Sequence, residues 1–200
     1  MRRAWIRAAS AVCCAWLAGC ATVPTESFHT LSVTAQQERQ GAAGVEPELS
    51  IAIDRIALPD IVDRPQFVLR VDPNRVRILE QQRWAESLRV AIPRVIAGNI
   101  ARILGTARVG AYPGDPPADV RYRIALDITQ FEAQSGAGVT VEATWIVRAV
   151  EGGARRSGHT MAQEPAAGPD YETLALAHSR ALGTISRDIA QAIAALARAQ

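Results

Sequence analysis

The stretch VRYRIALDITQFEAQSGAGVTVEATWIVRAV, residues 120–150, decides the fold class. Apolar and polar residues alternate along 120–131 and again along 139–150, and a Ser-Gly-Ala-Gly sequence separates the two runs. A period of two is typical of a strand with one buried and one solvated face, and a glycine-rich break between two such runs predicts an antiparallel hairpin. A Gly-Gly pair at 152–153 and a third run at 154–163 extend the hairpin to a three-stranded meander.

The region before this meander contains shorter alternating runs. They predict strands at 28–33, 49–58, 66–71, 75–80 and 108–112. Inside the second run the alternation slips by one residue near Asp54-Arg55, which predicts a β-bulge. The turn residues Asp72-Pro73-Asn74 predict that the third and fourth runs form a hairpin. Residues 34–48 show no periodicity and are expected to form a long loop.

Two helices are predicted from apolar stripes at three- and four-residue spacing. The first covers 84–104 and ends at Gly105, a natural C-cap; the second covers 171–198, with Asp170 as N-cap. Pro93 inside the first helix predicts a kink or a junction of two helices. The second stripe could carry a partner helix, but covering the sheet is its better use. The fold class is α+β: a mixed, largely antiparallel sheet with two main helices on one face.

The N-terminus has the pattern of an export signal. Residues 1–19 begin with arginines and continue with an apolar run too short to span a membrane. The run ends in Leu17-Ala18-Gly19-Cys20, which resembles the lipobox of bacterial lipoproteins. The resemblance implies cleavage before Cys20 and acylation of its thiol; the alternative is an ordinary signal peptide that leaves a plain thiol.

Cleavage at that position sets the domain organisation. It leaves a lipidated cysteine and short tether at 20–27, followed by a single domain at 28–200. Several acyl chains on Cys20 would hold the protein at a membrane stably. Ala21, in place of Asp, favours the outer membrane by resemblance to the enteric sorting rule. Cys13 and Cys14 leave with the signal, so the mature chain has no disulfide.

The residue inventory argues against catalysis. The chain has no lysine, which excludes a Walker A site and a Schiff-base lysine. His29, His159 and His178 stand alone, without a second metal ligand at local spacing, so neither a metal nor another cofactor is expected. Without the three arginines of the signal, 19 basic residues face 20 acidic ones, which gives no general attraction to nucleic acid. We expect a non-enzymatic protein.

Charged residues around the predicted hairpin are candidates for partner docking. Asp60 and Arg64 lie in a segment where acidic residues alternate with arginine, and arginine is favoured at protein interfaces. Solvated charge and weak surface ion pairs explain the same pattern without a partner. Trp84 follows the hairpin and is either a packing residue at the start of the helix or part of an interface. Asp60, Arg64 and Trp84 are the docking candidates.

The sequence IDRIALPDIVDRPQFVLRVDPNRVRILEQQRWAESL, residues 53–88, resembles the ABC-type transport auxiliary lipoproteins, the PqiC-like family. The match includes a strand that ends in Leu-Pro, a hairpin, and an Arg-Trp-Ala-Glu sequence before the helix. The sequence FHTL at 28–31 resembles the first strand of that family, and SRALGTISRDIAQAI at 179–193 resembles its closing helix. Pro93 is the departure.

The resemblance implies a role that composition and spacing cannot indicate. Family members accompany MCE-domain proteins and ABC permeases with their ATPases, in systems that move lipids or other hydrophobic compounds across the envelope. The lipoprotein would be the outer-membrane subunit facing the periplasm, and a homo-oligomeric ring would suit the ring-shaped MCE assembly. An envelope scaffold that activates a cell-wall enzyme is the alternative function, and a periplasmic hydrolase is the least favoured.

Overall fold

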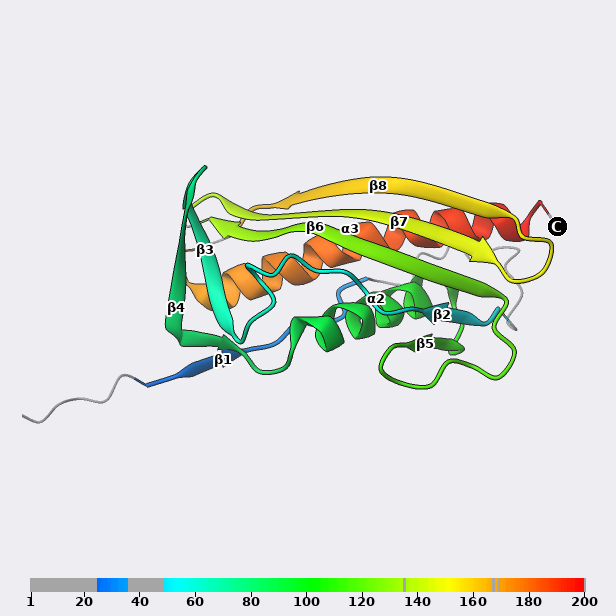
Figure 1. Ribbon diagram of the computed structural model, residues 1–200, viewed down its shortest axis with the longest axis horizontal. Coiled ribbons are helices and arrows are strands. Elements are labelled where there is room, and N and C mark those ends of the chain that lie inside the picture. Colours follow the sequence, from blue (N-terminus) through cyan, green and yellow to red (C-terminus); the bar gives the residue numbers. More distant parts are fainter. Residues whose placement is uncertain (1–24, 36–48, 135, 167, 169, 200) are drawn as a thin grey trace, which may run out of the picture.

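In the computed structural model, the described residues form eight strands in one mixed sheet and two long helices (Figure 1). The structure describes residues 25–35, 49–134, 136–166, 168 and 170–199. The predicted signal, the lipobox with Cys20 and most of the tether lie outside these residues. The α+β fold class predicted from the sequence is confirmed, with both helices beneath the long strands (Figure 1).

The meander predicted from the alternating runs is the largest part of the sheet. It consists of β6 (Tyr122–Gln134), β7 (Gly138–Ala149) and β8 (Arg155–Glu164), all antiparallel. Buried and exposed side chains alternate along β6 and β7, as a sheet with one covered face requires. A register shift between Ile128 and Gln130 puts one β-bulge into β6.

Five shorter strands complete the sheet. They are β1 (Ser27–His29), β2 (Ile51–Ile53), β3 (Gln66–Asp72), β4 (Arg75–Trp84) and β5 (Val109–Ala111). β2 and β3 both pair in parallel with β6, at opposite ends of that long strand. β3 and β4 form the predicted hairpin, and it stands at one end of the meander (Figure 1). The parallel pairs make the sheet mixed.

The predicted bulge near Asp54-Arg55 is confirmed in the pairing with β6. Ile53 is opposite Ile124, whereas Ala57 is opposite Asp127, so the segment after β2 carries one more residue than its partner. The Ala57 N–H donates to Leu126 O over 3.1 Å. The extra residue interrupts the pairing with β6, so β2 ends at Ile53. In the following segment, residues 54–58, only Ala57 pairs with β6 again, through an isolated bridge to Asp127.

The first helix starts later than predicted. Trp84 is the last residue of β4, because its N–H donates to Pro65 O over 2.7 Å and the residue pairs with His29 of β1. α2 (Leu88–Leu104) follows, and Gly105 caps it in the left-handed conformation, as predicted. Pro93 lies inside this one continuous helix, so the predicted junction of two helices is wrong. The buried Pro93 packs in the core-facing stripe.

α3 (Tyr171–Ala197) is the second predicted helix, and Asp170 is its N-cap residue, although the Asp170 side chain makes no capping hydrogen bond. The helix packs against β7, β8 and α2. Its buried side chains include those at both ends of the apolar stripe, Leu174 and Leu196. Among the described residues, neither helix has the length and hydropathy needed to span a membrane.

The chain after β1 leaves the sheet, so the predicted strand at 28–33 is only partly correct. Side chains of the two helices hold this segment: the Ser179 hydroxyl accepts from Ser32 N–H over 3.1 Å, and Asn99 Oδ1 accepts from the Thr34 and Ala35 N–H groups over 3.0 and 2.9 Å. The segment lies so close to α2 that a Cβ on Gly98 would be 2.6 Å from a Val33 methyl. These helix groups replace the sheet as hydrogen-bond partners.

Candidate functional site

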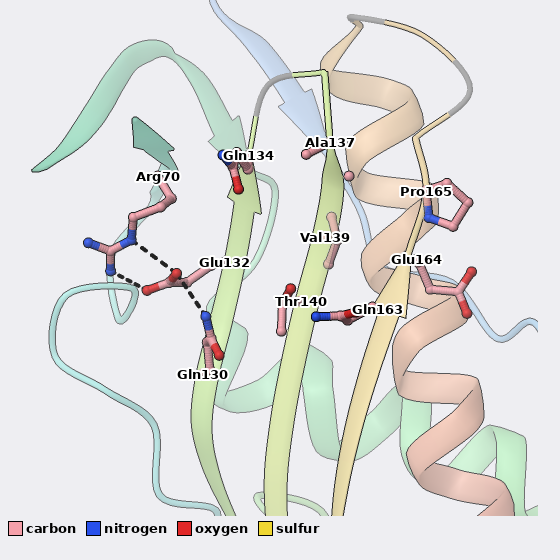
Figure 2. Close-up of a pocket in the computed structure, with 11 residues that line it drawn as sticks. Arg70, Gln130, Glu132, Gln134, Ala137, Val139, Thr140, Gln163, Glu164 and Pro165 are labelled. Carbon is pink, nitrogen blue, oxygen red and sulfur yellow. Dashed lines mark hydrogen bonds and ion pairs between the residues drawn. The ribbon is translucent and has the colours of Figure 1, made fainter. Parts of the chain in front are cut away.

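A polar hollow lies where the β3–β4 hairpin meets the outer face of the meander; we call it the polar corner. Its volume is about 380 Å³. Figure 2 shows its side chains coming from β3, β6, β7 and β8 and from the start of the segment after β8. Its lining residues with polar side chains are Arg70, Gln130, Glu132, Gln134, Thr140, Gln163 and Glu164, of which Glu164 points away from the hollow (Figure 2).

The bulge in β6 helps to place these side chains. The buried alternation of Ile124, Leu126 and Ile128 resumes at Phe131, one residue out of phase. Gln130 and Glu132 consequently both lie on the side of β6 away from the core, where Arg70 of β3 reaches them (Figure 2). The corner is therefore formed by strands from distant parts of the sequence.

Arg70 and Glu132 form the central ion pair of the corner. The Arg70 Nε donates to Glu132 Oε2 over 3.0 Å and Nη2 donates to the other carboxylate oxygen, while Gln130 Nε2 donates to Oε2 over 2.9 Å (Figure 2). The hydrogen bonds from Arg70 hold the pKa of Glu132 below its ordinary value, and the same pairing raises the pKa of Arg70. The pairing with Arg70 therefore favours the ionised form of Glu132.

The other charged groups at the rim are also paired. Arg180 of α3 binds Glu164 over 3.0 Å and donates to Pro165 O over 2.6 Å. Three polar side chains of the corner, those of Gln134, Thr140 and Gln163, have no hydrogen-bond partner among the described residues. The same part of the chain also contains no group of three His, Cys, Asp or Glu residues that could hold a metal ion. The corner therefore offers neutral donors and acceptors, which suit binding of a polar surface.

An aromatic cluster lies inside the protein, next to the corner. Phe67 stacks on Trp84 with ring centroids 4.4 Å apart, and the His178 ring lies 4.2 Å from that of Phe131 and 5.6 Å from that of Trp84. His178 is fully buried, and Nδ1 donates to Leu174 O over 2.9 Å. Loss of solvation lowers the pKa of His178 to about 4, so the ring is neutral in the folded protein at pH 7.

Asp60 and Arg64 lie in one short loop before β3. The Pro59 carbonyl accepts from the Val62 and Asp63 N–H groups over 3.0 and 3.1 Å, which closes the loop. Asp60 is exposed and Arg64 is half-buried, with its Nε buried and without a hydrogen-bond partner in the described residues. The structure therefore brings these two docking candidates together on a surface loop.

Trp84 does not join them at the surface. Its backbone contacts the loop through Pro65, but only 6% of the residue is exposed, and its ring is part of the aromatic cluster. The packing interpretation of Trp84 is favoured by this placement. The indole is buried because β4 continues to residue 84 and turns this side chain under the sheet.

Sequence reasoning missed the polar corner. Arg70 was recognised only as one of several arginines, and Gln130, Glu132 and Gln163 were not identified. Arg70, Gln130 and Glu132 are half-buried and Gln163 is exposed, and Gln130 falls on the apolar phase of the alternation in 120–131, so no local signal marks them as a group. Their convergence depends on the parallel pairing of β3 with β6, which places Leu69 opposite Ala133.

Comparison with known families gives one match, which covers most of the chain. The model of the ABC-type transport auxiliary lipoprotein component family matches residues 29–190. The chain belongs to this family. The resemblance noted in residues 53–88 is thereby confirmed, and an auxiliary lipoprotein of an ABC-type transport system implies partners in a transporter. Comparison with curated proteins gave no match.

Solved structures support the fold of this auxiliary lipoprotein. Protein XCC0632 from Xanthomonas campestris, described as family-model DUF330, aligns with a TM-score of 0.70 at 15% identity, over 87% of this chain and 99% of the other. An uncharacterised protein aligns with a TM-score of 0.65 at 14% identity, over 84% and 99%. At these identities the similarity establishes the fold alone.

Proposed function

We propose that this protein is a non-enzymatic auxiliary subunit of an MCE/ABC-type transport system that moves lipids or hydrophobic compounds across the envelope. Acyl chains on Cys20 would anchor it in the outer membrane, facing the periplasm. It would dock an MCE-domain protein and, through that protein, the ABC permease and its ATPase. We expect the protein to form a homo-oligomeric ring, because such a ring would fit a ring-shaped partner.

The observation that carries this proposal is the family match over residues 29–190. Two further features support it. The lipobox residues Leu17-Ala18-Gly19-Cys20 stand at the end of the predicted signal, with Cys20 as the first residue after it, as acylation requires. The charged side chains that line the polar corner are held in ion pairs, which favours recognition over chemistry.

The loop with Asp60 and Arg64 is the proposed docking contact. Asp60 is exposed, whereas Trp84 is too buried to take part, so we propose that docking depends on the two loop residues alone. Arg64 is better left unchanged in a test, because its side chain is half-buried and its replacement would also change packing in the loop. Asp60 can be changed with less risk to the fold.

Crosslinking of the full-length protein in intact membranes, followed by affinity purification and mass spectrometry, tests the partner. We expect recovery of an MCE-domain protein together with permease and ATPase subunits. Asp60→Arg should reduce that recovery, and Asp115→Arg, an exposed loop acid elsewhere, should not. Recovery of a cell-wall enzyme without any transporter subunit would instead support the scaffold alternative.

Cys20→Ser tests the anchor separately. We expect the variant to lose acylation, measured by mass spectrometry of the N-terminal peptide, and to leave the membrane fraction. Loss of crosslinked partners in this variant, with the folded domain intact by circular dichroism, would link docking to anchoring. Unchanged membrane fractionation would contradict the anchor and leave the docking test to stand alone.

A further inference from the structure

One long edge of the sheet is free. β8 pairs with β7 on one side, and within the described ranges no strand pairs with its other side. The Ala149 N–H donates to Ala154 O over 2.8 Å, so this opposed pair is a hydrogen-bonded one. Such pairs alternate along an antiparallel ladder, and the β7–β8 register is unbroken, so even-numbered residues of β8 bond to β7. Its odd-numbered residues direct their N–H and C=O groups to the free edge.

β8 carries charged residues only at its two ends, Arg155, Arg156 and Glu164, and the stretch between them lacks the features that usually protect an edge strand. Proteins shield such edges with short strands, charges, proline or bulges. β1 and β5 have three residues each, and β4 carries Arg75, Arg77 and Glu80 along its exposed length. By contrast, 157–163 in β8 contains no proline, no bulge and no acidic residue or arginine. β8 is therefore open to the addition of another strand.

A groove follows the same edge, between β8 and α3. Its volume is about 370 Å³, and its lining residues are Trp145, Arg156, Ser157, Asp188, Gln191 and Ala192. The Trp145 ring lies across β8 at Gly158, where a Cβ would be 2.2 Å from the indole Cζ2. The missing side chain lets the indole extend toward the free edge. An inward side chain of an added strand would meet an apolar ring there.

One charge at the end of the groove indicates what would bind. Arg156 lines the groove where β8 begins, and it has no ion-pair partner among the residues that the structure describes. Arg148 and Arg155 are an opposed pair on the other face of the sheet, so Arg156 is the arginine that faces the groove. The carboxylate of Asp188 accepts a hydrogen bond from the Thr160 hydroxyl over 2.7 Å, farther along the groove. An acidic side chain opposite Arg156 would complement this end.

We propose that the free edge of β8 binds an extended segment of a partner protein with the pattern apolar-x-acidic. The segment adds antiparallel to β8, the orientation with the more stable ladder. Its apolar side chain lies against Trp145 opposite Gly158, and its acidic side chain, two residues later, lies opposite Arg156. In Figure 1 the β7–β8 turn and β1 are at opposite ends of the molecule, so this contact lies far from β1. The proposal does not depend on the transported cargo.

The probe is a fluorescein-labelled peptide, Thr-Val-Thr-Val-Thr-Glu-Glu, with blocked ends, and its counterpart ends in Lys-Lys. Fluorescence anisotropy with the purified full-length protein should show saturable binding of the acidic peptide and weaker binding of the basic one. Arg156→Gln should weaken binding of the acidic peptide by about two- to fivefold, as for an exposed ion pair. Arg156→Glu should reverse the preference between the two peptides.

Ser157→Pro tests the backbone edge. Ser157 directs its N–H away from β7, so proline removes a donor from the free edge without breaking the β7–β8 ladder, and peptide affinity should fall at least about tenfold. Ser157→Ala keeps the N–H and should bind as the parent does. Circular dichroism checks that each variant is folded. If Ser157→Pro is misfolded, the proposal is tested by whether Arg156→Glu reverses the preference between the two peptides.

Three results would overturn the proposal. The first is equal binding, or no binding, of the two peptides to the parent protein. The second is parental affinity in folded Ser157→Pro. The third is a dimer, seen by light scattering, that Ser157→Pro converts to a monomer, because the edge would then belong to a second copy of the chain.

Discussion

The two tryptophans of the described chain mark two regions that are built differently. Trp84 lies beside the polar corner, sealed among the rings of Phe67, Phe131 and His178. Trp145 lies over Gly158, donates from Nε1 to Thr160 Oγ1 over 3.1 Å, and lines an open groove. Both are nearly buried, with 6% and 8% exposed. Burial alone does not distinguish a core residue from one beside a docking surface.

The arginines of the two regions differ in whether they are already paired with a carboxylate. At the polar corner Arg70 and Arg180 are each committed to a carboxylate of their own chain. At the groove Arg156 has no ion-pair partner among the described residues. A charge that is already paired gains little from a partner, whereas an unpaired one can add steering and specificity. The paired charges of the corner therefore stabilise the fold and leave its neutral groups for contacts, whereas Arg156 at the groove is a charge that a partner can use.

The largest expected effect separates the two tryptophans. Trp84→Ala should lower the free energy of unfolding by about 3–5 kcal/mol, because it leaves a cavity among rings that cannot close it. Trp145→Ala should cost less, about 2 kcal/mol, since the open groove admits water where the indole was. Urea denaturation followed by circular dichroism measures both. Equal losses would remove the distinction between the regions.

The second-largest effect is expected from acid, which should lower the free energy of unfolding through His178 in the aromatic cluster. His178 has a folded pKa of about 4, below the ordinary value of 6.5, so between these values the unfolded chain binds a proton that the folded protein excludes. Stability is complete above pH 6.5 and falls as the pH drops toward 4, by about 3 kcal/mol in all. Urea titrations at pH 7 and pH 4.5 test this.

His178→Phe should abolish most of that dependence, and its matched control is His159→Gln. His159 is exposed on β8 and binds Glu142, so its replacement should leave the pH dependence intact. If the free energy of unfolding of His178→Phe still fell between pH 7 and pH 4.5 as in the parent, other groups would be the cause of the acid sensitivity.

The Arg70–Glu132 ion pair of the corner should contribute less to the free energy of unfolding than Trp84 or His178. Glu132→Gln replaces the anion that Arg70 grips with two hydrogen bonds, and the free energy of unfolding should fall by about 1–2 kcal/mol at pH 7. Because pairing lowers the pKa of Glu132, its contribution is present above the ordinary carboxyl pKa and is lost as the pH falls below it. The exposed pair Arg75–Asp72 is the control: Asp72→Asn should change stability by less than about 0.5 kcal/mol.

The smallest effect on stability is expected at the groove. Arg156→Gln should change the free energy of unfolding by less than about 0.5 kcal/mol, as for other surface positions without special contacts. The same variant should weaken binding of the acidic peptide. A large loss of stability would mean that Arg156 belongs to the fold, as Arg70 does, and the contrast between the regions would fail.

Much of the secondary structure could be predicted from the chain. The meander, the β3–β4 hairpin, both helices and the bulge after β2 were all indicated by local periodicity and turn residues. The errors lie at ends and junctions. The strand at 28–33 is cut short because Asn99 and Ser179 capture the backbone that follows β1, and Trp84 was assigned to the helix because its apolar spacing fits both elements.

The candidate sites could be predicted only in part. Asp60 and Arg64 are neighbours in sequence and remain neighbours in the fold. Arg70 and Glu132 are 62 residues apart, and Trp145 and Asp188 are brought together by the packing of α3 on β8. Spacing within a segment carries no information on such pairs.

The sequence by itself determined which residues form strands and helices and which face of each element is apolar, because those properties repeat within a few residues. Tertiary structure alone decided that β2 and β3 pair in parallel with β6, that Trp84 is sealed inside, and that β8 has no second strand beside it in the part of the chain that the structure describes. The physical reason is that these outcomes depend on contacts between segments far apart in the chain, which form only when the whole core is packed.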